Sequence, residues 1–207
     1  FRKEDLDDIP ATLCSAITLS TLHGTKPEEI RSICDYLIEE KQLNTFVKCN
    51  PTLLGYDFAR ETLDKMGYDY IAFDDHHFKH DLQYEDAIAM FDELIEEASA
   101  NDLVFGVKLT NTFPVKVENK ELPAEEMYMS GRALLPLTIS LAAKLSETTG
   151  GRMPISFSGG ADANSLKDIL ATGIGPVTMA TTLLKPGGYL RFRQLAEQAA
   201  EAAMDWF

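Results

Sequence analysis

The sequence predicts an α/β fold: an incomplete (β/α)8 barrel of the TIM-barrel type, formed by about six β/α units that make up its C-terminal part. Short apolar, β-branched runs alternate with amphipathic helical segments along the 207 residues. Such alternation is typical of a parallel sheet with right-handed crossovers. Small or polar residues follow each predicted strand, as they do at the catalytic face of a barrel. A doubly wound open sheet is the alternative, but no GxGxxG motif follows the first predicted strand.

Composition favours one globular domain over residues 1–207 and excludes several classes of partner. The chain is 45% hydrophobic and carries a net charge of −14, which disfavours nucleic acid and anionic membrane surfaces. No apolar run approaches the roughly 20 residues that span a bilayer. Because the first residue is Phe1, we expect a fragment of a longer chain. The three cysteines form no CxxC pair, which fits reduced thiols in a cytoplasmic protein.

The first half of the chain contains three predicted units. Residues 11–19 form a run of small and β-branched residues that predicts a buried strand, and a Thr25–Glu28 capping box predicts a helix that extends to Glu40. The other predicted elements of this half are strands at 45–49 and 70–73 and helices at 56–66, ended by Gly67, and at 84–99.

The second half contains three further units and one long connection. Residues 113–129 are interpreted as a long loop of the kind that forms lids or binding loops. The remaining predicted elements are strands at 103–109, 155–157 and 177–179, and helices from Ser130 to Leu145, from a cap at Asn164 to Gly173, and at 191–204.

Two small-residue turns follow the last two predicted strands, Ser158-Gly159-Gly160 and Ala180-Thr181-Thr182. Adjacent parallel strands that end in such turns direct free backbone N–H groups toward one point, and these groups bind a phosphate well. The alternative is that the glycines only turn the chain.

Lysines near the ends of two other strands indicate the remainder of a ligand site. Lys48 lies in VKCNPT and Lys108 in VKLTNT, each followed by Asn and Thr residues. A lysine in an apolar strand is costly unless it meets an anion or an electron-rich ligand, or reaches solvent. A phosphate at one side and a polar ring edge facing Lys and Asn together describe flavin mononucleotide (FMN).

Several motifs carry a resemblance to known flavoproteins. VKCNPT, VKLTNT, MSGRALLPL, ISFSGG and TMATTLLKPGG resemble the FMN barrel of dihydroorotate and dihydropyrimidine dehydrogenases. STLHG, MGYDYIAFDDHHF and SGGADA, with the same strand ends, more closely resemble the amino-terminal part of the large bacterial flavoprotein subunits named selenate reductase.

The resemblance implies an oxidoreductase barrel, with FAD, NAD(P) and iron–sulfur clusters only in other parts of the full chain. It implies a small-molecule substrate, contact with the rest of the parent chain or other redox subunits, and a possible homodimer. The implied FMN-binding residues are Lys48, Lys108, Asn111, Thr112, Ser130, Gly131, Ser158, Gly159, Gly160, Ala180, Thr181 and Thr182.

The chain departs from those dehydrogenases at their acid/base residue. The related stretch here, LSTLHGTKPEEI, has no Cys, so His23 and Thr25 are the available substitutes and the catalytic residue stays open. Which of the two lysines faces the flavin also stays open.

Two other functions fit the same residues. A strand-end lysine could form a Schiff base in a phosphate-dependent aldolase or isomerase. A barrel without an acid/base loop could instead be a non-catalytic scaffold for other redox domains. The Asp74-Asp75-His76-His77 run, with His80 and Asp81, has the ligand types of a metal site, but a hydrogen-bonded or substrate-contacting loop is favoured and no metal is expected.

Overall fold

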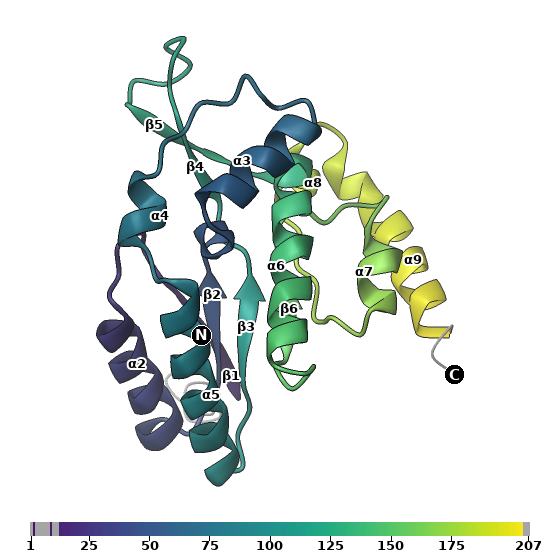
Figure 1. Ribbon diagram of the computed structural model, residues 1–207. Coiled ribbons are helices and arrows are strands. Elements are labelled where there is room, and N and C mark those ends of the chain that lie inside the picture. Colours follow the sequence, from purple (N-terminus) through teal and green to yellow (C-terminus); the bar gives the residue numbers. More distant parts are fainter. Residues whose placement is uncertain (1, 3–8, 10–12, 205–207) are drawn as a thin grey trace.

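The centre of the molecule is a parallel sheet of four strands. The computed structural model describes residues 2, 9 and 13–204. The strands follow one another in space in the order of the sequence: β1 (Ala16–Ser20), β2 (Asn44–Cys49), β3 (Phe105–Leu109) and β6 (Ile155–Phe157) (Figure 1). An isolated parallel bridge joins Phe157 to Val177, where the sequence predicts a further strand at 177–179; no full strand forms there.

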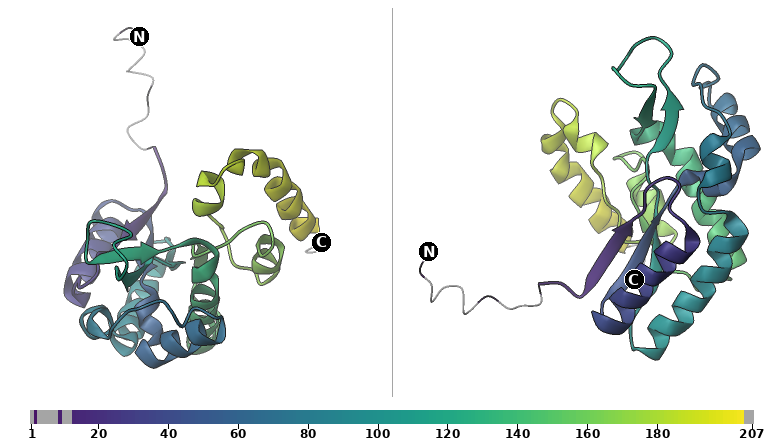
Figure 2. Two further views of the ribbon diagram at one scale, coloured as in Figure 1. Left: turned by 90° about the horizontal axis from the view of Figure 1, so that it is seen from above. Right: turned by 90° about the vertical axis from the view of Figure 1, so that its left-hand side faces the viewer.

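Helices cover one side of this sheet. α2 (Pro27–Asp35), α5 (Tyr84–Ala100) and α6 (Leu135–Thr148) all lie on the same side, as the two views at right angles show (Figures 1 and 2). A doubly wound sheet has helices on both faces and a reversal of strand order. Sequential order with one-sided helices is the arrangement of a barrel, so the predicted fold class is confirmed.

The remaining helical elements are short or lie at the end of the chain. The α-helices are α3 (Tyr56–Lys65), α4 (His76–His80), α7 (Leu166–Ala171), α8 (Thr181–Leu184) and α9 (Phe192–Met204). A π-helical turn, Tyr36–Glu40, continues α2, and 3-10 turns lie at Pro51–Leu54, Gly131–Leu134 and Gly188–Arg191.

The main core lies between the sheet and its helices. Along β2 every second residue is buried, so Val47 and Cys49 face the helices while Lys48 points to the other side. Phe91 and Leu94 of α5 are fully buried in the same cluster. Burying each such apolar side chain contributes about 1.5–3 kcal/mol, and this burial fixes which face of β2 carries Lys48.

The predicted strand at 70–73 is wrong. β2 pairs directly with β3, with Thr45 opposite Phe105 and Lys48 opposite Lys108, which leaves no place for a strand between them. Residues 70–73 lie outside the four-stranded sheet, where the carbonyl of Ala72 accepts a hydrogen bond from the backbone N–H of Lys116 at 2.8 Å.

The first strand is shorter and more exposed than predicted. β1 begins at Ala16, and residues 11 and 12 of the expected strand lie outside the described part of the chain. The strand lies at the sheet edge and pairs only with β2 among the described strands, so most of its side chains are exposed rather than buried.

The segment 113–129 is a hairpin rather than a plain loop. β4 (Phe113–Lys116) pairs antiparallel with β5 (Glu126–Met129), and Pro114 lies opposite Tyr128. The hairpin projects beyond the carboxyl ends of the parallel strands (Figure 1), where it extends the wall of the site.

Several helix ends differ from expectation. α2 begins at Pro27 after Lys26, and the Thr25 hydroxyl donates to the carbonyl of Leu22 at 2.8 Å, so no capping box forms. The residue that precedes α7 is Ser165 rather than Asn164. The predicted loop around His76 contains the helix α4. Gly67 and Gly173 have φ values of +78° and +87° just after their helices, as the sequence predicts.

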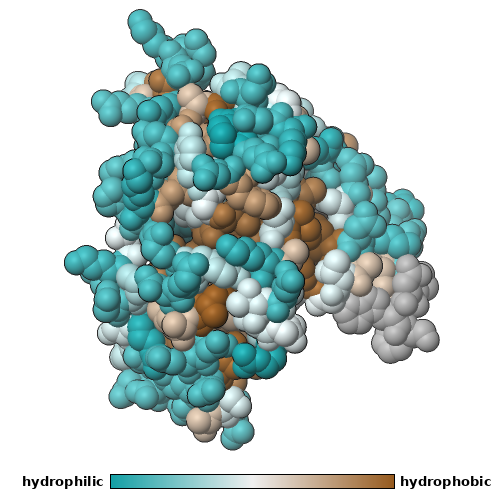
Figure 3. All heavy atoms as spheres, in the orientation of Figure 1, coloured by the Kyte–Doolittle hydropathy of each residue, from teal (hydrophilic) through white to brown (hydrophobic). Residues whose placement is uncertain are grey.

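The outer face of the helices is mostly hydrophilic (Figure 3). Hydrophobic side chains gather in the centre of this face over α3 and α6, where Phe58 and Ile139 are partly exposed. Within the described residues, no helix is both long and apolar enough to cross a bilayer.

Candidate functional site

A row of polar residues crosses the four parallel strands near their carboxyl ends. Ser20 is the register partner of Lys48, Lys48 of Lys108, and Lys108 of Ser156. Residues in register on parallel strands direct their side chains to the same face, here the one opposite the helices. The sheet therefore places the two lysines side by side on the side that would be the inside of a barrel.

Neither lysine has an ion-pair partner within the described part of the chain. Burial lowers the pKa of Lys48, and the neighbouring charge of Lys108 lowers it further. Two half-buried ammonium groups together are unfavourable without an anion, because each disfavours the charge of the other. In a chain of net charge −14, this pair is an isolated positive site suited to an anionic or electron-rich ligand.

A cavity of about 260 Å³ lies over these lysines. Nine of the twelve predicted cofactor residues line it: Lys48, Lys108, Thr112, Ser130, Gly131, Ser158, Gly160, Ala180 and Thr181. The other lining residues are Thr110, Leu134, Ala161, Thr178 and Met179. The Ser158-Gly159-Gly160 turn and the two lysines thus meet at one place with Ala180 and Thr181. The predicted second turn is wrong in part, because Thr181 begins the short helix α8.

The Ser158-Gly159-Gly160 turn is closely packed against the start of α6. A Cβ atom on Gly159 would lie 2.0 Å from Thr138 Oγ1, and one on Gly160 would lie 2.5 Å from the carbonyl oxygen of Gly131. Gly160 also has a φ of +86°. Glycine is needed here because the backbone of the turn directly contacts the backbone before α6.

Three predicted residues do not line this cavity. Gly159 lies behind it against Thr138, and Thr182 is not among its lining residues. The Asn111 amide nitrogen instead donates to Asn50 Oδ1 at 2.7 Å and makes longer contacts to the carbonyls of Thr21 and Lys48, which ties together the ends of three strands.

A second cavity of about 460 Å³ adjoins the first and shares Thr112 with it. Among the described residues its wall has hydroxyl, amide and ring side chains with one leucine, and no carboxylate, lysine or arginine: Ser20, Thr21, Leu22, His23, Asn111, Thr112 and Tyr128. Tyr128 comes from the β4–β5 hairpin, so the hairpin closes the side of this cavity.

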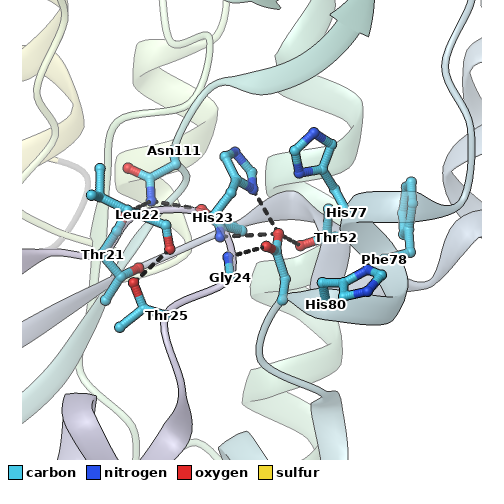
Figure 4. A network of polar contacts seen from close by, with 12 residues as sticks. Thr21, Leu22, His23, Gly24, Thr25, Thr52, His77, Phe78, His80 and Asn111 are labelled. Atoms are coloured by element: carbon cyan, nitrogen blue, oxygen red, sulfur yellow. Dashed lines mark hydrogen bonds and ion pairs between the residues drawn. The ribbon is translucent and has the colours of Figure 1, made fainter.

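A buried carboxylate holds the loop that follows β1. The Asp81 side chain is 1% exposed, and its Oδ2 accepts hydrogen bonds from His23 Nδ1 at 2.7 Å, Thr52 Oγ1 at 2.7 Å and Asn50 Nδ2 at 3.1 Å. Its Oδ1 accepts from the backbone N–H of Gly24 at 2.8 Å. Figure 4 shows three of these donors, His23, Gly24 and Thr52, converging from separate segments. Burial alone would raise the pKa of Asp81, but the hydrogen bonds from His23, Thr52 and Gly24 hold it below its usual value.

The histidine–aspartate run of the sequence, Asp74 to Asp81, does not converge as a unit. Instead His23 joins His77 and Asp81, with one donor atom from each within 4.8 Å of the others. The Asp81 carboxylate already accepts four hydrogen bonds, and His77 Nε2 lies 2.9 Å from Glu126 Oε1. We assign no metal site, because the Asp81 carboxylate and His77 Nε2 already have hydrogen-bond partners.

Sequence reasoning missed two polar residues that line the cavities. Thr178 lies just before Ala180, and Tyr128 lies in the segment interpreted as a loop. The alternation of apolar and polar residues in Glu126–Met129 is a strand signal that could have placed Tyr128.

The fold and the site define a parallel α/β barrel with a lysine-containing cavity at the carboxyl ends of its strands. The chain belongs to the family of the N-terminal TIM-barrel domain of oxidoreductase YgfK, whose model matches residues 1–206. It is 55% identical over 183 residues to "Putative oxidoreductase YgfK" of Escherichia coli strain K12, and equally to that of strain O157:H7. The match covers 88% of this chain but 18% of each relative, so the chain spans about a fifth of their length.

Among solved structures, the chain is similar to DHODH from Eimeria tenella, determined in complex with ferulenol. The TM-score is 0.53 at 16% identity, and the match covers 89% of this chain and 49% of the other. At this identity the likeness shows the shared fold alone.

Proposed function

We propose that this chain is the FMN-binding barrel segment of a multi-domain oxidoreductase. The observation that carries the proposal is the pair Lys48 and Lys108, half-buried, in register and without an acidic partner in the described chain, beside two small-residue turns in one cavity. The oxidoreductase family of the chain supports the same class of chemistry.

The residues present fit this cofactor in their chemistry. The hydroxyls of Ser130, Ser158 and Thr181 and the nearby turn backbones are suited to a phosphate. The lysines can compensate negative charge and donate to the polar edge of a planar ring. When bound, FMN would supply two-electron redox chemistry that no side chain offers. The cavity and its neighbour together exceed the roughly 300 Å³ lower limit that is usual for such ligands.

A flavin titration of the full-length protein that contains this chain tests the proposal. We expect FMN to bind and its fluorescence to change. Lys108→Ala and Lys48→Ala should each weaken binding about tenfold or more, since each removes a charge-assisted contact. The matched control is Lys65→Ala, because Lys65 is 71% exposed on α3, and its affinity should equal wild type.

Comparison of FMN with riboflavin separates the phosphate from the ring. Tighter binding of FMN, lost on substitution of Thr181 and Ser158 by Ala, would support the phosphate position. A full-length protein that takes up no flavin, or Lys48 and Lys108 variants that bind FMN as wild type does, would contradict the proposal.

A second candidate function is a Schiff-base aldolase or isomerase. The observation in its favour is the lowered pKa of Lys48, which burial and the adjacent Lys108 cause. A lysine desolvated beside another cation is the usual nucleophilic form. Borohydride trapping with a phosphosugar would leave covalent mass on Lys48 or Lys108 if this function held, and neither lysine should be labelled if FMN binds there.

The same proposal includes the location of the barrel and its neighbours in the full-length protein. We place the barrel in the cytoplasm, in line with its free thiols, in contact with other redox parts of its own chain that would carry FAD, NAD(P) and iron–sulfur clusters. Selenate is the acceptor named by the resemblance to the large bacterial flavoprotein subunits. Selenate-dependent oxidation of NAD(P)H by the full-length protein would extend the proposal to that substrate.

A further inference from the structure

The contacts of Asp81 determine how His23 is presented. The carboxylate accepts from the ring Nδ1, so a neutral His23 keeps its proton on Nδ1. The second ring nitrogen, Nε2, has no hydrogen-bond partner within the described residues and remains the position that can give or take a proton. The same carboxylate binds the backbone N–H of the next residue, Gly24, which fixes the loop that carries the ring.

His23 also borders the cavity that adjoins the proposed flavin cavity. Its side chain is 16% exposed and lines the larger cavity, which shares Thr112 with the lysine-containing one. The ring plane is nearly parallel to that of Tyr128, at 17° with centroids 6.1 Å apart. Figure 4 shows the ring standing beside His77, and their centroids are 4.8 Å apart.

Resting on the function proposed above, we propose that His23 is the residue that transfers a proton to and from the substrate in this second cavity, with Asp81 as its positioning residue. The uncharged hydroxyl and amide lining suits a small neutral molecule with hydrogen-bonding groups. The substrate class is a conjugated carbonyl compound, whose two-electron reduction requires one proton at carbon.

The reduction of such a substrate consumes one hydride and one proton. Reduction of a C=C bond next to a carbonyl breaks the π bond and forms two C–H bonds. A bound reduced flavin would supply the hydride, and Nε2 of protonated His23 gives the proton. His23 is left neutral with its proton on Nδ1, Asp81 stays ionised, and solvent in the open cavity restores the proton on Nε2. Oxidation runs the same transfer in reverse.

The state of His23 can be measured without turnover. In protein with 15N-labelled histidine, long-range 1H–15N spectra should show neutral His23 protonated on Nδ1. Asp81→Asn should populate both tautomers, because an amide cannot accept hydrogen bonds on both of its atoms. The matched control is His80→Gln, since the exposed His80 contacts the ring and the carbonyl of His76 rather than His23. This variant should leave the His23 signals unchanged.

The transfer itself is tested with the full-length protein and two oxidants. Ferricyanide accepts electrons without a proton at carbon, whereas 2-cyclohexen-1-one needs one. We expect His23→Gln to slow anaerobic reoxidation of the reduced protein by the enone at least about 100-fold while the ferricyanide rate stays within about twofold. Asp81→Asn should give a smaller loss and a shifted pH profile. The titratable groups facing the ring are Asp81, His77 with its partner Glu126, and Tyr128.

The outcomes separate the two proposals. No flavin uptake, or no ferricyanide reduction by wild type, refutes the flavin function. Normal ferricyanide reduction with equal enone rates in wild type and His23→Gln refutes the role of His23 alone, and enone inertness of wild type refutes the substrate class. If His23→Gln does not fold, the 1H–15N spectra of the wild-type protein still test the inference. A proton on Nε2 of neutral His23, or a metal tightly bound to this ring, would overturn it.

Discussion

At the scale of single residues, the Asp81 carboxylate links folding to pH. It is buried, and its pKa is lowered by its hydrogen bonds. A carboxyl group whose folded pKa lies below its unfolded value of about 3.9 stabilises the protein above that unfolded value, and this contribution is lost as pH falls through the folded pKa. Asp81→Asn should therefore cost about 1–3 kcal/mol in urea unfolding at neutral pH. The difference from wild type should shrink below about pH 4; a difference independent of pH would contradict this account.

The cysteines give a second prediction at this scale. Burial raises the pKa of the Cys34 and Cys49 thiols to about 12 in each case, whereas Cys14 is exposed. The thiolate is the reactive form, so Cys34 and Cys49 should not react with a disulfide reagent in the folded protein at pH about 8. We expect one thiol to react in native protein and all three after unfolding. Two or more reactive native thiols would show that the core opens under these conditions.

At the scale of elements, Gly160 allows the Ser158-Gly159-Gly160 turn to pack directly against the start of α6. An alanine there combines a positive φ with a Cβ that would lie 2.5 Å from the carbonyl oxygen of Gly131 and 2.7 Å from the backbone nitrogen of Leu135. Because backbone atoms cannot easily move away, Gly160→Ala should destabilise by about 3 kcal/mol. Gly150→Ala is the matched control, since Gly150 has a φ of +59° and open space around it, and should cost about 1 kcal/mol.

Urea unfolding measures both variants. Equal losses for Gly150→Ala and Gly160→Ala would mean that the contact with α6 is unimportant and that only backbone strain matters. FMN binding by the Gly160 variant should also fall, because the turn that lines the cavity must shift.

Most strands of the sheet, and the position of Lys48 and Lys108 at strand ends, could be predicted from the sequence because each depends on a local pattern. The strand-end lysines follow directly from apolar runs that end in Asn and Thr, and parallel pairing places them together. The run at 70–73 misled because its apolar residues serve another purpose. The ring of Phe73 lies 4.9 Å from that of Phe113 and 5.5 Å from that of Tyr56, so it packs under the hairpin rather than in the sheet.

The Asp81 network could not be predicted in this way. Its donors come from positions 29 to 58 residues away in the chain, and no local pattern links them. A polar residue of this kind gains its role only when the loops after β1 and β2 meet it in the folded protein. Tyr128 differs, because the alternation in Glu126–Met129 is a local strand signal, although only the folded hairpin brings its ring to the second cavity.

At the scale of the whole molecule, the sheet has an edge at β1. This strand pairs on one side with β2 and has no second strand neighbour among the described residues, and Ile17 is 38% exposed. An unpaired edge with exposed apolar side chains favours pairing with another chain.

We expect the 207-residue chain to dimerise reversibly in sedimentation velocity as its concentration rises. Ile17→Lys should weaken this association, because a charge on an edge strand opposes pairing. Ile33→Lys is the matched control, since Ile33 is 42% exposed but lies on the helix α2 and not on the edge strand. If both lysine variants weaken association equally, general charge repulsion rather than the β1 edge controls it.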